Sequence, residues 1–183
     1  NFDQRHIVNL SWVWDVPIFK NPGFANKVLG GWQYSGIFSY STGAPYSVVF
    51  SGDNAGVANG VGSSSRPDVI GDPRSGIVQS QLDGFGPLFG NPNAFVTPRG
   101  LTFGDSGRNN MRNPNRSNFD MALFKHFKFT ETSGFEFRAE AFNVFNHTQW
   151  NGVNNDQSSP GNFLQPSGAH RARTLQFGAK FIF

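Results

Sequence analysis

The stretch NFDMALFKHFKFTETSGFEFRAEAFNVF, residues 118–145, decides the fold class. Its first half alternates apolar residues at odd positions with more polar residues at even positions, and its second half repeats this from Phe135. A period of two residues is typical of a half-buried strand, because successive side chains of a strand point to opposite faces. The two halves are joined by Thr130–Gly134, a length typical of a hairpin loop. The stretch therefore predicts two antiparallel strands, over about 118–129 and 135–146.

Three further segments alternate in the same way, over about 5–16, 30–50 and 173–183. Most of the expected strands run for roughly ten to thirteen residues, whereas strands of soluble sheets usually have about five or six. A tilted strand needs about 9–11 residues to cross a bilayer. Soluble β-sandwiches also alternate, but their strands and loops are usually shorter. The lengths favour membrane-spanning strands over those of a sandwich.

The connections between these strands alternate between shorter and longer. The first, 17–31, is modest and contains Asn21-Pro22-Gly23, and the third has only five residues. The second and fourth are long and polar, over about 51–117 and 147–172. Outer-membrane barrels place short turns on the periplasmic side and long loops outside. The sequence therefore predicts an all-β, antiparallel up-and-down transmembrane β-barrel segment, with about five long strands and long extracellular loops.

Composition agrees with this prediction. Phe occurs 21 times, Gly 22 times and Pro 11 times, and only 15% of the residues are charged. Aromatic residues favour pleated surfaces, and glycine and proline favour turns. Mean hydropathy is −0.39, and no run of 18 apolar residues predicts a transmembrane helix. Barrel strands keep a low average hydropathy because only one of their faces is apolar.

Charge and cysteine content exclude several function classes. The net charge is +3, but the 15 Lys and Arg residues are scattered rather than gathered in a patch, which argues against nucleic-acid binding. Cysteine is absent, which removes disulfide frameworks, thiolate metal sites and Cys nucleophiles.

The odd positions of the last three strands are expected to face lipid. This set comprises Phe119, Met121, Leu123, Phe127, Phe135, Phe137, Leu175, Phe177 and Phe181. A second set of aromatic residues lies at or near the expected strand ends, where barrels carry aromatic girdles: Trp12, Trp14, Trp32, Tyr34, Phe145, Trp150, Phe181 and Phe183. The alternative is that these are ordinary aromatic core residues.

Two motifs resemble those of a known family. The last segment, RTLQFGAKFIF at 173–183, resembles the final-strand signal that outer-membrane proteins present to their assembly machinery, with Phe177, Phe181 and Phe183 as its aromatic positions. The stretch FRAEAFNVFNHT at 137–148 resembles a late-strand motif of TonB-dependent receptors. The similarity is greatest to Oar-like receptors that contain a carboxypeptidase-regulatory domain.

Other pieces follow in the order expected of that family. They are DQRH at 3–6, GGWQY at 30–34, STGAPY at 41–46, NAF at 93–95, FGDSGRN at 103–109 and NFD at 118–120. The resemblance implies that residues 1–183 form the C-terminal part of an outer-membrane barrel that takes up a bulky nutrient. It implies contacts with outer-membrane lipid and the barrel-assembly machinery, and with the TonB system through upstream regions. Such receptors have about 22 strands and a plug, of which this chain supplies about five strands.

The chain begins at Asn1 rather than Met, so we expect a trimmed chain or a piece of a longer one. Five strands leave two open edges, and unpaired backbone groups are costly in lipid. The chain is therefore expected either to belong to a longer receptor or to pair its edges with other copies. The second possibility gives an alternative function, a self-assembling extracellular protein that forms filaments or tubes.

No catalytic, cofactor or metal residue is predicted. Gly104-Asp105-Ser106-Gly107 resembles the nucleophile loop of chymotrypsin-like proteases, but Arg108 stands where those continue with glycine, and a Gly-rich turn explains it equally. The four histidines show no metal-ligand spacing. Three aspartates of the long loop, Asp53, Asp68 and Asp72, either bind calcium or form turns. The run Ser51–Ser65 is either a ligand-contacting loop or a linker.

Overall fold

The computed structural model describes residues 3–17, 23–56, 65–77 and 87–183. Asn21 and Pro22 of the first expected turn, and most of the Ser51–Ser65 run, lie outside these ranges. The described residues divide into two compact units, and no described helix is long and apolar enough to span a bilayer. We call them the sheet unit, formed by Ile7–Tyr40, Ser117–Thr148 and Arg171–Phe183, and the loop unit, formed by Asn1–His6, Ser41–Arg116 and Gln149–His170.

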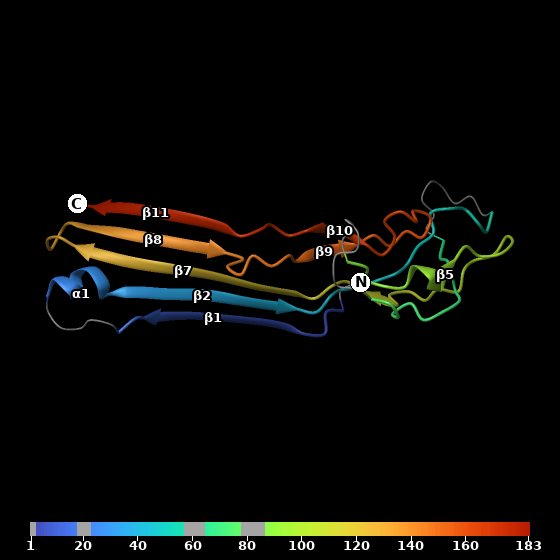
Figure 1. Cartoon of the computed structure of the whole chain (residues 1–183), viewed down its shortest axis with the longest axis horizontal. Coiled ribbons are helices and arrows are strands. Elements are labelled where there is room, and N and C mark those ends of the chain that lie inside the picture. Colours follow the sequence, from blue (N-terminus) through green and yellow to red (C-terminus); the bar gives the residue numbers. More distant parts are fainter. Residues whose placement is uncertain (1–2, 18–22, 57–64, 78–86) are drawn as a thin grey trace. The chain divides into compact units, whose positions relative to one another are not determined.

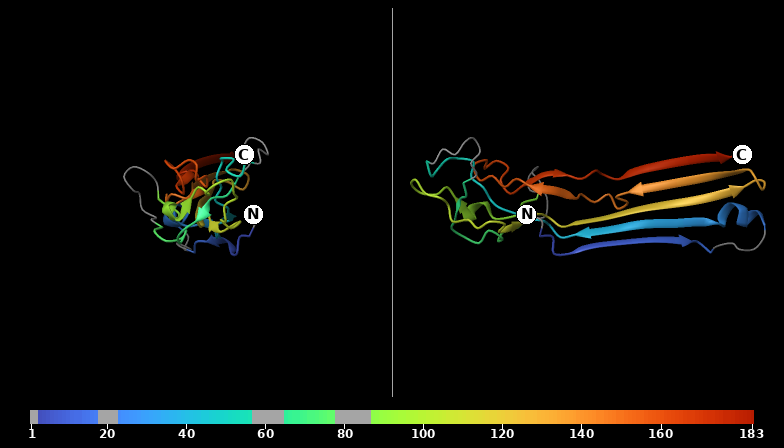
Figure 2. Two further views of the ribbon diagram at one scale, coloured as in Figure 1. Left: turned by 90° about the vertical axis from the view of Figure 1, so that its right-hand side faces the viewer. Right: turned by 180° about the vertical axis from the view of Figure 1, so that it is seen from behind.

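The sheet unit contains one five-stranded sheet in the order β1-β2-β7-β8-β11 (Figure 1). Its strands are β1 (Ile7–Asp15), β2 (Trp32–Ser41), β7 (Arg116–Lys128), β8 (Gly134–Phe142) and β11 (Thr174–Ile182). The expected segments 5–16, 118–129 and 173–183 each contain or overlap one of these strands closely. The view from behind shows the same succession of strands, with β1 and β11 at the two edges (Figure 2).

The C-terminal hairpin and the last strand are paired without interruption. β8 pairs antiparallel with β7 from Met121↔Ala141 to Lys128↔Gly134. On its other side β8 pairs antiparallel with β11, from Thr174↔Phe142 to Ile182↔Gly134. The hairpin turn is closed by the Thr130 hydroxyl, whose oxygen lies 2.9 Å from the Ser133 amide nitrogen that donates to it. This register places odd positions of β7 opposite odd positions of β8 and β11, as the alternation predicts.

The first short connection contains a helix that the sequence did not predict. α1 (Phe24–Leu29) has six residues and ends at Gly30, whose amide donates to the Asn26 carbonyl. The helix lies directly before β2 in the chain (Figure 1).

The expected strand over 30–50 is too long. β2 ends at Ser41, and the chain then enters β3 (Pro45–Tyr46), which pairs with β6 (Met111–Arg112) in a separate sheet. The break falls at Gly43, where a Cβ atom would overlap the backbone of Asn113. Only glycine permits this close approach of two backbones.

The expected strand over 135–146 is also too long at its C-terminal end. β8 stops at Phe142 because Asn143 adopts a positive φ of 50°, which interrupts an extended strand. The Asn143 amide donates to the carboxylate of Asp120, and its side chain donates to the carbonyls of His147 and Arg171. Asn143 therefore ends the strand and is hydrogen-bonded to the segments that follow. The last predicted positions of the alternating set, including Phe145, lie beyond β8.

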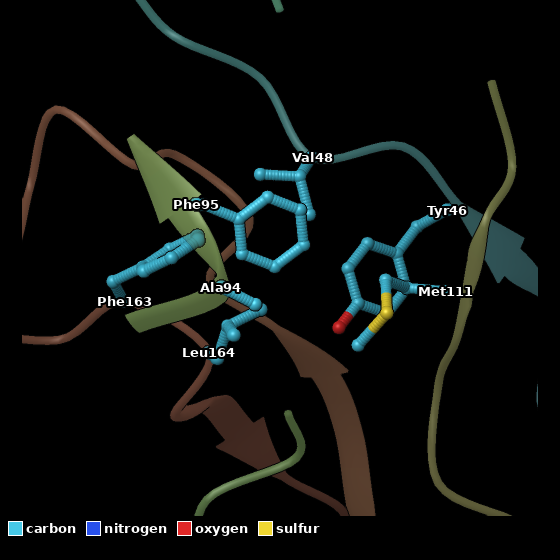
Figure 3. Packing of buried hydrophobic residues seen from close by; sticks show 7 residues of the cluster. All are labelled: Tyr46, Val48, Ala94, Phe95, Met111, Phe163 and Leu164. Atoms are coloured by element: carbon cyan, nitrogen blue, oxygen red, sulfur yellow. The ribbon is translucent and has the colours of Figure 1, made fainter. Parts of the chain in front are cut away.

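The loop unit contains short strands and a hydrophobic core of its own. The expected loop 51–117 includes β4 (Asp68–Val69), η1 (Pro92–Ala94), β5 (Phe95–Val96) and β6, and the loop 147–172 includes β9 (Trp150–Val153) and β10 (Pro166–Ala169). β4 pairs with β5, and β9 with β10. Seven buried residues form the core (Figure 3): Tyr46, Val48, Ala94, Phe95, Met111, Phe163 and Leu164. Both long loops contribute to this core, which makes them parts of one folded unit.

Aspartate side chains fasten the segments of the loop unit to one another. Asp156 accepts hydrogen bonds from the amide and hydroxyl of Ser51 and from the amide and hydroxyl of Ser158. Desolvation works against the charge of Asp156, but these hydrogen bonds outweigh it and hold the pKa of the carboxyl below its usual value. The carboxylate thus links segments more than a hundred residues apart in sequence.

We expect Asp156→Asn to lower the stability of the loop unit at neutral pH by about 1–3 kcal/mol, because hydrogen bonds to a charged acceptor are lost. The pKa of Asp156 is lower in the folded than in the unfolded protein. Its carboxylate therefore stabilises the folded state at pH values above the unfolded pKa, and this stabilisation is lost as pH falls through the folded pKa. The difference between wild type and variant should therefore shrink below about pH 4. This stability difference is measured by hydrogen exchange of the Ser51 and Ser158 amides in the full-length polypeptide.

The matched control is Asp72→Asn, because the described hydrogen bond of the Asp72 carboxylate comes from the Arg74 amide within its own turn. We expect Asp72→Asn to change the hydrogen exchange of the Ser51 amide less than Asp156→Asn does. If the stability difference between wild type and Asp156→Asn stays constant down to pH 3, the charge of Asp156 does not have the role assigned to it.

Candidate functional site

The pleat of the sheet unit separates its side chains into two chemically different faces. One, the aromatic face, carries the even positions of β1 and β2 and the odd positions of β7, β8 and β11. The ring contacts establish this assignment across β2 and β7: Phe38 stacks on Phe119 with ring centres 4.4 Å apart, and the Tyr34 hydroxyl donates to the Met121 sulfur over 3.1 Å. The opposite, polar face carries the remaining positions of these strands.

At the short-turn end of the aromatic face, aromatic rings from four strands contact one another. The Phe135 ring lies 5.9 Å from that of Phe127 on β7 and 5.0 Å from that of Phe181 on β11, centre to centre. Trp32 on β2 meets Phe137 edge to face at 6.2 Å. Such pairs contribute about 0.5–1.5 kcal/mol each beyond the area that they bury. They align β2, β7, β8 and β11 at this end of the sheet.

Toward the loop end, a second aromatic group forms around Phe119, which contacts Phe38 and also Phe145, at 5.1 Å edge to face. On the same face, Trp12 of β1 covers Gly36 of β2. A Cβ atom at Gly36 would overlap the Trp12 ring. Glycine is therefore required at this position for the indole to lie flat on the neighbouring strand.

The polar face carries a ladder of charged side chains. Glu136 lies 3.4 Å from the His126 ring nitrogen and 3.6 Å from the Arg138 guanidinium, whose other nitrogen is 3.8 Å from Glu140. The Arg138 guanidinium also stacks over the Phe124 ring at 4.9 Å. His126 and Arg138 are well exposed, whereas the two glutamates are only about one-fifth exposed. Long ion pairs with an exposed partner contribute little to stability, so the ladder gives this face its charge more than it holds the sheet together.

Part of the polar face is hollowed and partly apolar. An open hollow of about 360 Å³ lies over β1, β2, β7 and β8, and its walls include Ile37, Ala122, Phe124, Glu140 and Phe142. The hollow can accommodate apolar as well as charged groups, since the ladder runs along one side of it.

The structure brings the predicted lipid-facing residues together on the aromatic face. Within the described register, Leu175 and Met121 both lie opposite Ala141, and Phe177 and Leu123 both lie opposite Ala139. Phe177 and Phe181 are each 69% exposed. Phe183, the last residue of the predicted assembly signal, follows the end of β11 and is fully exposed. Contact of these residues with lipid and with an assembly machinery remains a prediction.

Five of the eight predicted girdle residues lie on strands of the sheet, but Phe145, Trp150 and Phe183 do not. Trp12 and Trp14 lie on β1, Trp32 and Tyr34 on β2, and Phe181 on β11. Trp150 belongs to β9 of the loop unit, because the chain leaves the sheet at Asn143.

One charged residue on the aromatic face was visible in the sequence but given no role. Lys125 occupies an odd position of β7 opposite Phe137, and it is only 2% exposed. Its ammonium donates to the Gly30 carbonyl and lies over the rings of Trp32 and Phe127, at 5.6 and 5.0 Å from their centres. The alternation placed it on this face, but only the tertiary structure shows the carbonyl and the rings around it.

The Gly104–Gly107 motif and the aspartates of the long loop serve as turns in the loop unit. Ser106 is buried, and its hydroxyl accepts a hydrogen bond from the Asn110 side chain. Asp105 accepts from the Val69 amide, and Asp68 accepts from the Asp105 amide in return. Within the part of the chain that the structure describes, no three His, Cys, Asp or Glu residues are grouped as a metal site.

Comparison with known proteins agrees with a sheet that has one aromatic and one polar face. Residues 1–176 match the family model described as an outer membrane beta barrel domain. The chain belongs to this outer membrane β-barrel family. Neither a curated protein nor a solved structure matches it.

Family membership fixes the surroundings of the two faces. A member of the outer membrane β-barrel family lies in the bacterial outer membrane, where its sheet forms part of an antiparallel transmembrane barrel. The all-β prediction and the predicted location in the outer membrane are thereby confirmed.

We expect Phe177→Lys to reduce the folded fraction strongly, because a lysine on the lipid face near the middle of a strand costs about 2–4 kcal/mol. The matched control is Gln176→Lys, which introduces the same charge one residue away on the polar face, directly opposite Glu140. We expect this variant to assemble normally. The measurement is the fraction of heat-modifiable, folded protein in isolated outer membranes, and equal tolerance of both lysines would contradict the assignment of the faces.

Proposed function

We propose that this chain forms part of the barrel of a TonB-dependent transporter that takes up a bulky nutrient, and that it has no catalytic role. The observation that carries the proposal is the loop unit, in which two long segments fold around one hydrophobic core. A simple diffusion pore needs no large folded structure on its long-loop side. Capture of a large ligand before transport does need an ordered surface there, which supports an uptake receptor.

The polar face supports the same proposal. In a barrel, positions that alternate with the lipid-facing ones point into the lumen. The ladder from His126 to Glu140 and the partly apolar hollow beside it would line that lumen. Such a surface suits contact with a plug or with a passing polar ligand. The resemblance of FRAEAFNVFNHT to the late-strand motif of TonB-dependent receptors adds the energy-coupled mechanism to the proposal.

The edges of the sheet favour a second candidate. Among the described strands, β1 and β11 each have a neighbour on one side only. Even small closed barrels need about eight strands, so the five strands require further strands, from a longer chain or from other copies. Pairing between copies would give the alternative function, a self-assembling β-rich structural protein. We favour the transporter because a closed barrel also pairs both edge strands, and in addition it places the two chemically distinct faces in different surroundings.

The deciding experiment measures the denatured mass of the native polypeptide, in isolated outer membranes and in the secreted fraction, together with uptake by intact cells. We expect a polypeptide several times longer than 183 residues in the membrane, and uptake of its nutrient that stops when the proton-motive force is collapsed. A long membrane protein whose deletion leaves all energy-dependent uptake unchanged would contradict transport. A chain of about this length, found as high-order assemblies outside the cell, would instead establish the structural alternative.

A further inference from the structure

The surroundings of Lys125 hold its ammonium at the short-turn end of the aromatic face. The side chain is nearly fully buried between Trp32 and Phe127, and its nitrogen reaches the Gly30 carbonyl at the end of α1. An ammonium has three N–H donors, and Gly30 accepts from one of them. The rings stabilise its charge through their negative faces. The remaining donors can serve a ligand next to this carbonyl.

A cavity of about 580 Å³ lies beside this ammonium, and its lining is basic. It is lined by Asn26, Gly30, Lys125, His126, Lys128 and Phe129, together with neighbouring backbone. None of the described residues that line it is a carboxylate. The described ion pairs include His126 with Glu136, but neither Lys125 nor Lys128. The cavity thus combines two lysines, neither of them paired within the described chain, and it favours an anion.

Apolar side chains are exposed on the two elements that contribute to the lining of this cavity, α1 and the end of β7. Phe24 of α1 is 83% exposed and Phe129 is 65% exposed, while Val28 and Leu29 of α1 are also turned outward. Apolar residues next to basic ones are typical of segments that lie in the boundary between lipid headgroups and acyl chains. A free inorganic anion would use the lysines but leave these apolar groups without a partner. The ligand that matches both is an amphiphile with a negatively charged headgroup.

We propose that this cavity binds an anionic phospholipid from the leaflet on the short-turn side, which faces the periplasm in outer-membrane barrels. The phosphate oxygens accept hydrogen bonds from the ammonium groups of Lys125, on the aromatic face, and of Lys128, as charged donors and acceptors do at close range. Lys128 has a polar-face position, but it is the last residue of β7 and lines the same cavity at the end of the strand. The acyl chains lie along the aromatic face, beginning at Phe127 and Phe129. The site depends on the sheet lying in the outer membrane and not on what the barrel transports.

The test uses the full-length native polypeptide, purified in detergent and titrated with phosphatidylglycerol while bound lipid is counted by native mass spectrometry. The variants are Lys128→Gln and the double variant Lys125→Met with Lys128→Gln. Loss of a charged contact worth about 1.4 kcal/mol lowers affinity tenfold, so we expect roughly a tenfold loss in Lys128→Gln and a larger loss in the double variant. The matched control is Lys180→Met, which removes a lysine from the polar face of β11, opposite Glu136.

Four results overturn the proposal. The first is unchanged phosphatidylglycerol binding in both cavity variants, and the second is an equal loss in Lys180→Met. The third is displacement of the lipid by inorganic phosphate at matched concentration, because this would make the cavity a site for free anions. Binding of phosphatidylcholine as tight as that of phosphatidylglycerol would overturn the preference for an anionic headgroup. If removal of Lys125 prevents assembly, seen as loss of the heat-modifiable band, Lys128→Gln alone decides the test.

Discussion

The pairing of backbone hydrogen bonds between strands is the constraint on which the rest of the sheet unit depends. Lipid offers no partner for an N–H or C=O group, so each strand within the bilayer must satisfy its backbone through its neighbours. β8 does so on both sides, with β7 and with β11. Once strands pair in this way, alternate side chains must point to opposite surroundings. The aromatic and polar faces follow from the backbone, and residue chemistry then decides which face meets lipid.

The two units are stabilised by different means. Every residue of the described buried hydrophobic core, from Tyr46 to Leu164, belongs to the loop unit. The sheet unit instead exposes large apolar side chains such as Phe177 and Phe181. Exposed apolar surface of this kind indicates contact with another apolar phase. The loop unit therefore folds by burying its own side chains away from water, whereas the sheet requires a bilayer to cover it.

The regular part of the fold could be predicted from sequence, and the irregular part could not. A two-residue period located all five long strands and the face shared by Leu123 and Phe177. It could not locate their ends, because the period continues past Ser41 and Asn143, where a backbone contact at Gly43 and a positive φ stop the strands. The core of the loop unit was missed because Tyr46 and Leu164 are far apart in sequence and follow no period. Lys125 was visible, but its partners, Gly30 and Trp32, come from another element.

The dimensions of the aromatic face explain the position of Lys125. From Phe119 to Phe127, the members of the two aromatic groups on β7, eight residues span about 26 Å along the strand, or roughly 20 Å across the membrane at a tilt of about 40°. This is close to the apolar band of about 25 Å that such barrels present. Lys125 lies just inside this band, and its long apolar stem lets the ammonium reach the boundary. The carbonyl of Gly30 and the rings around the ammonium meet it there, so a charged residue can occupy a position on the aromatic face.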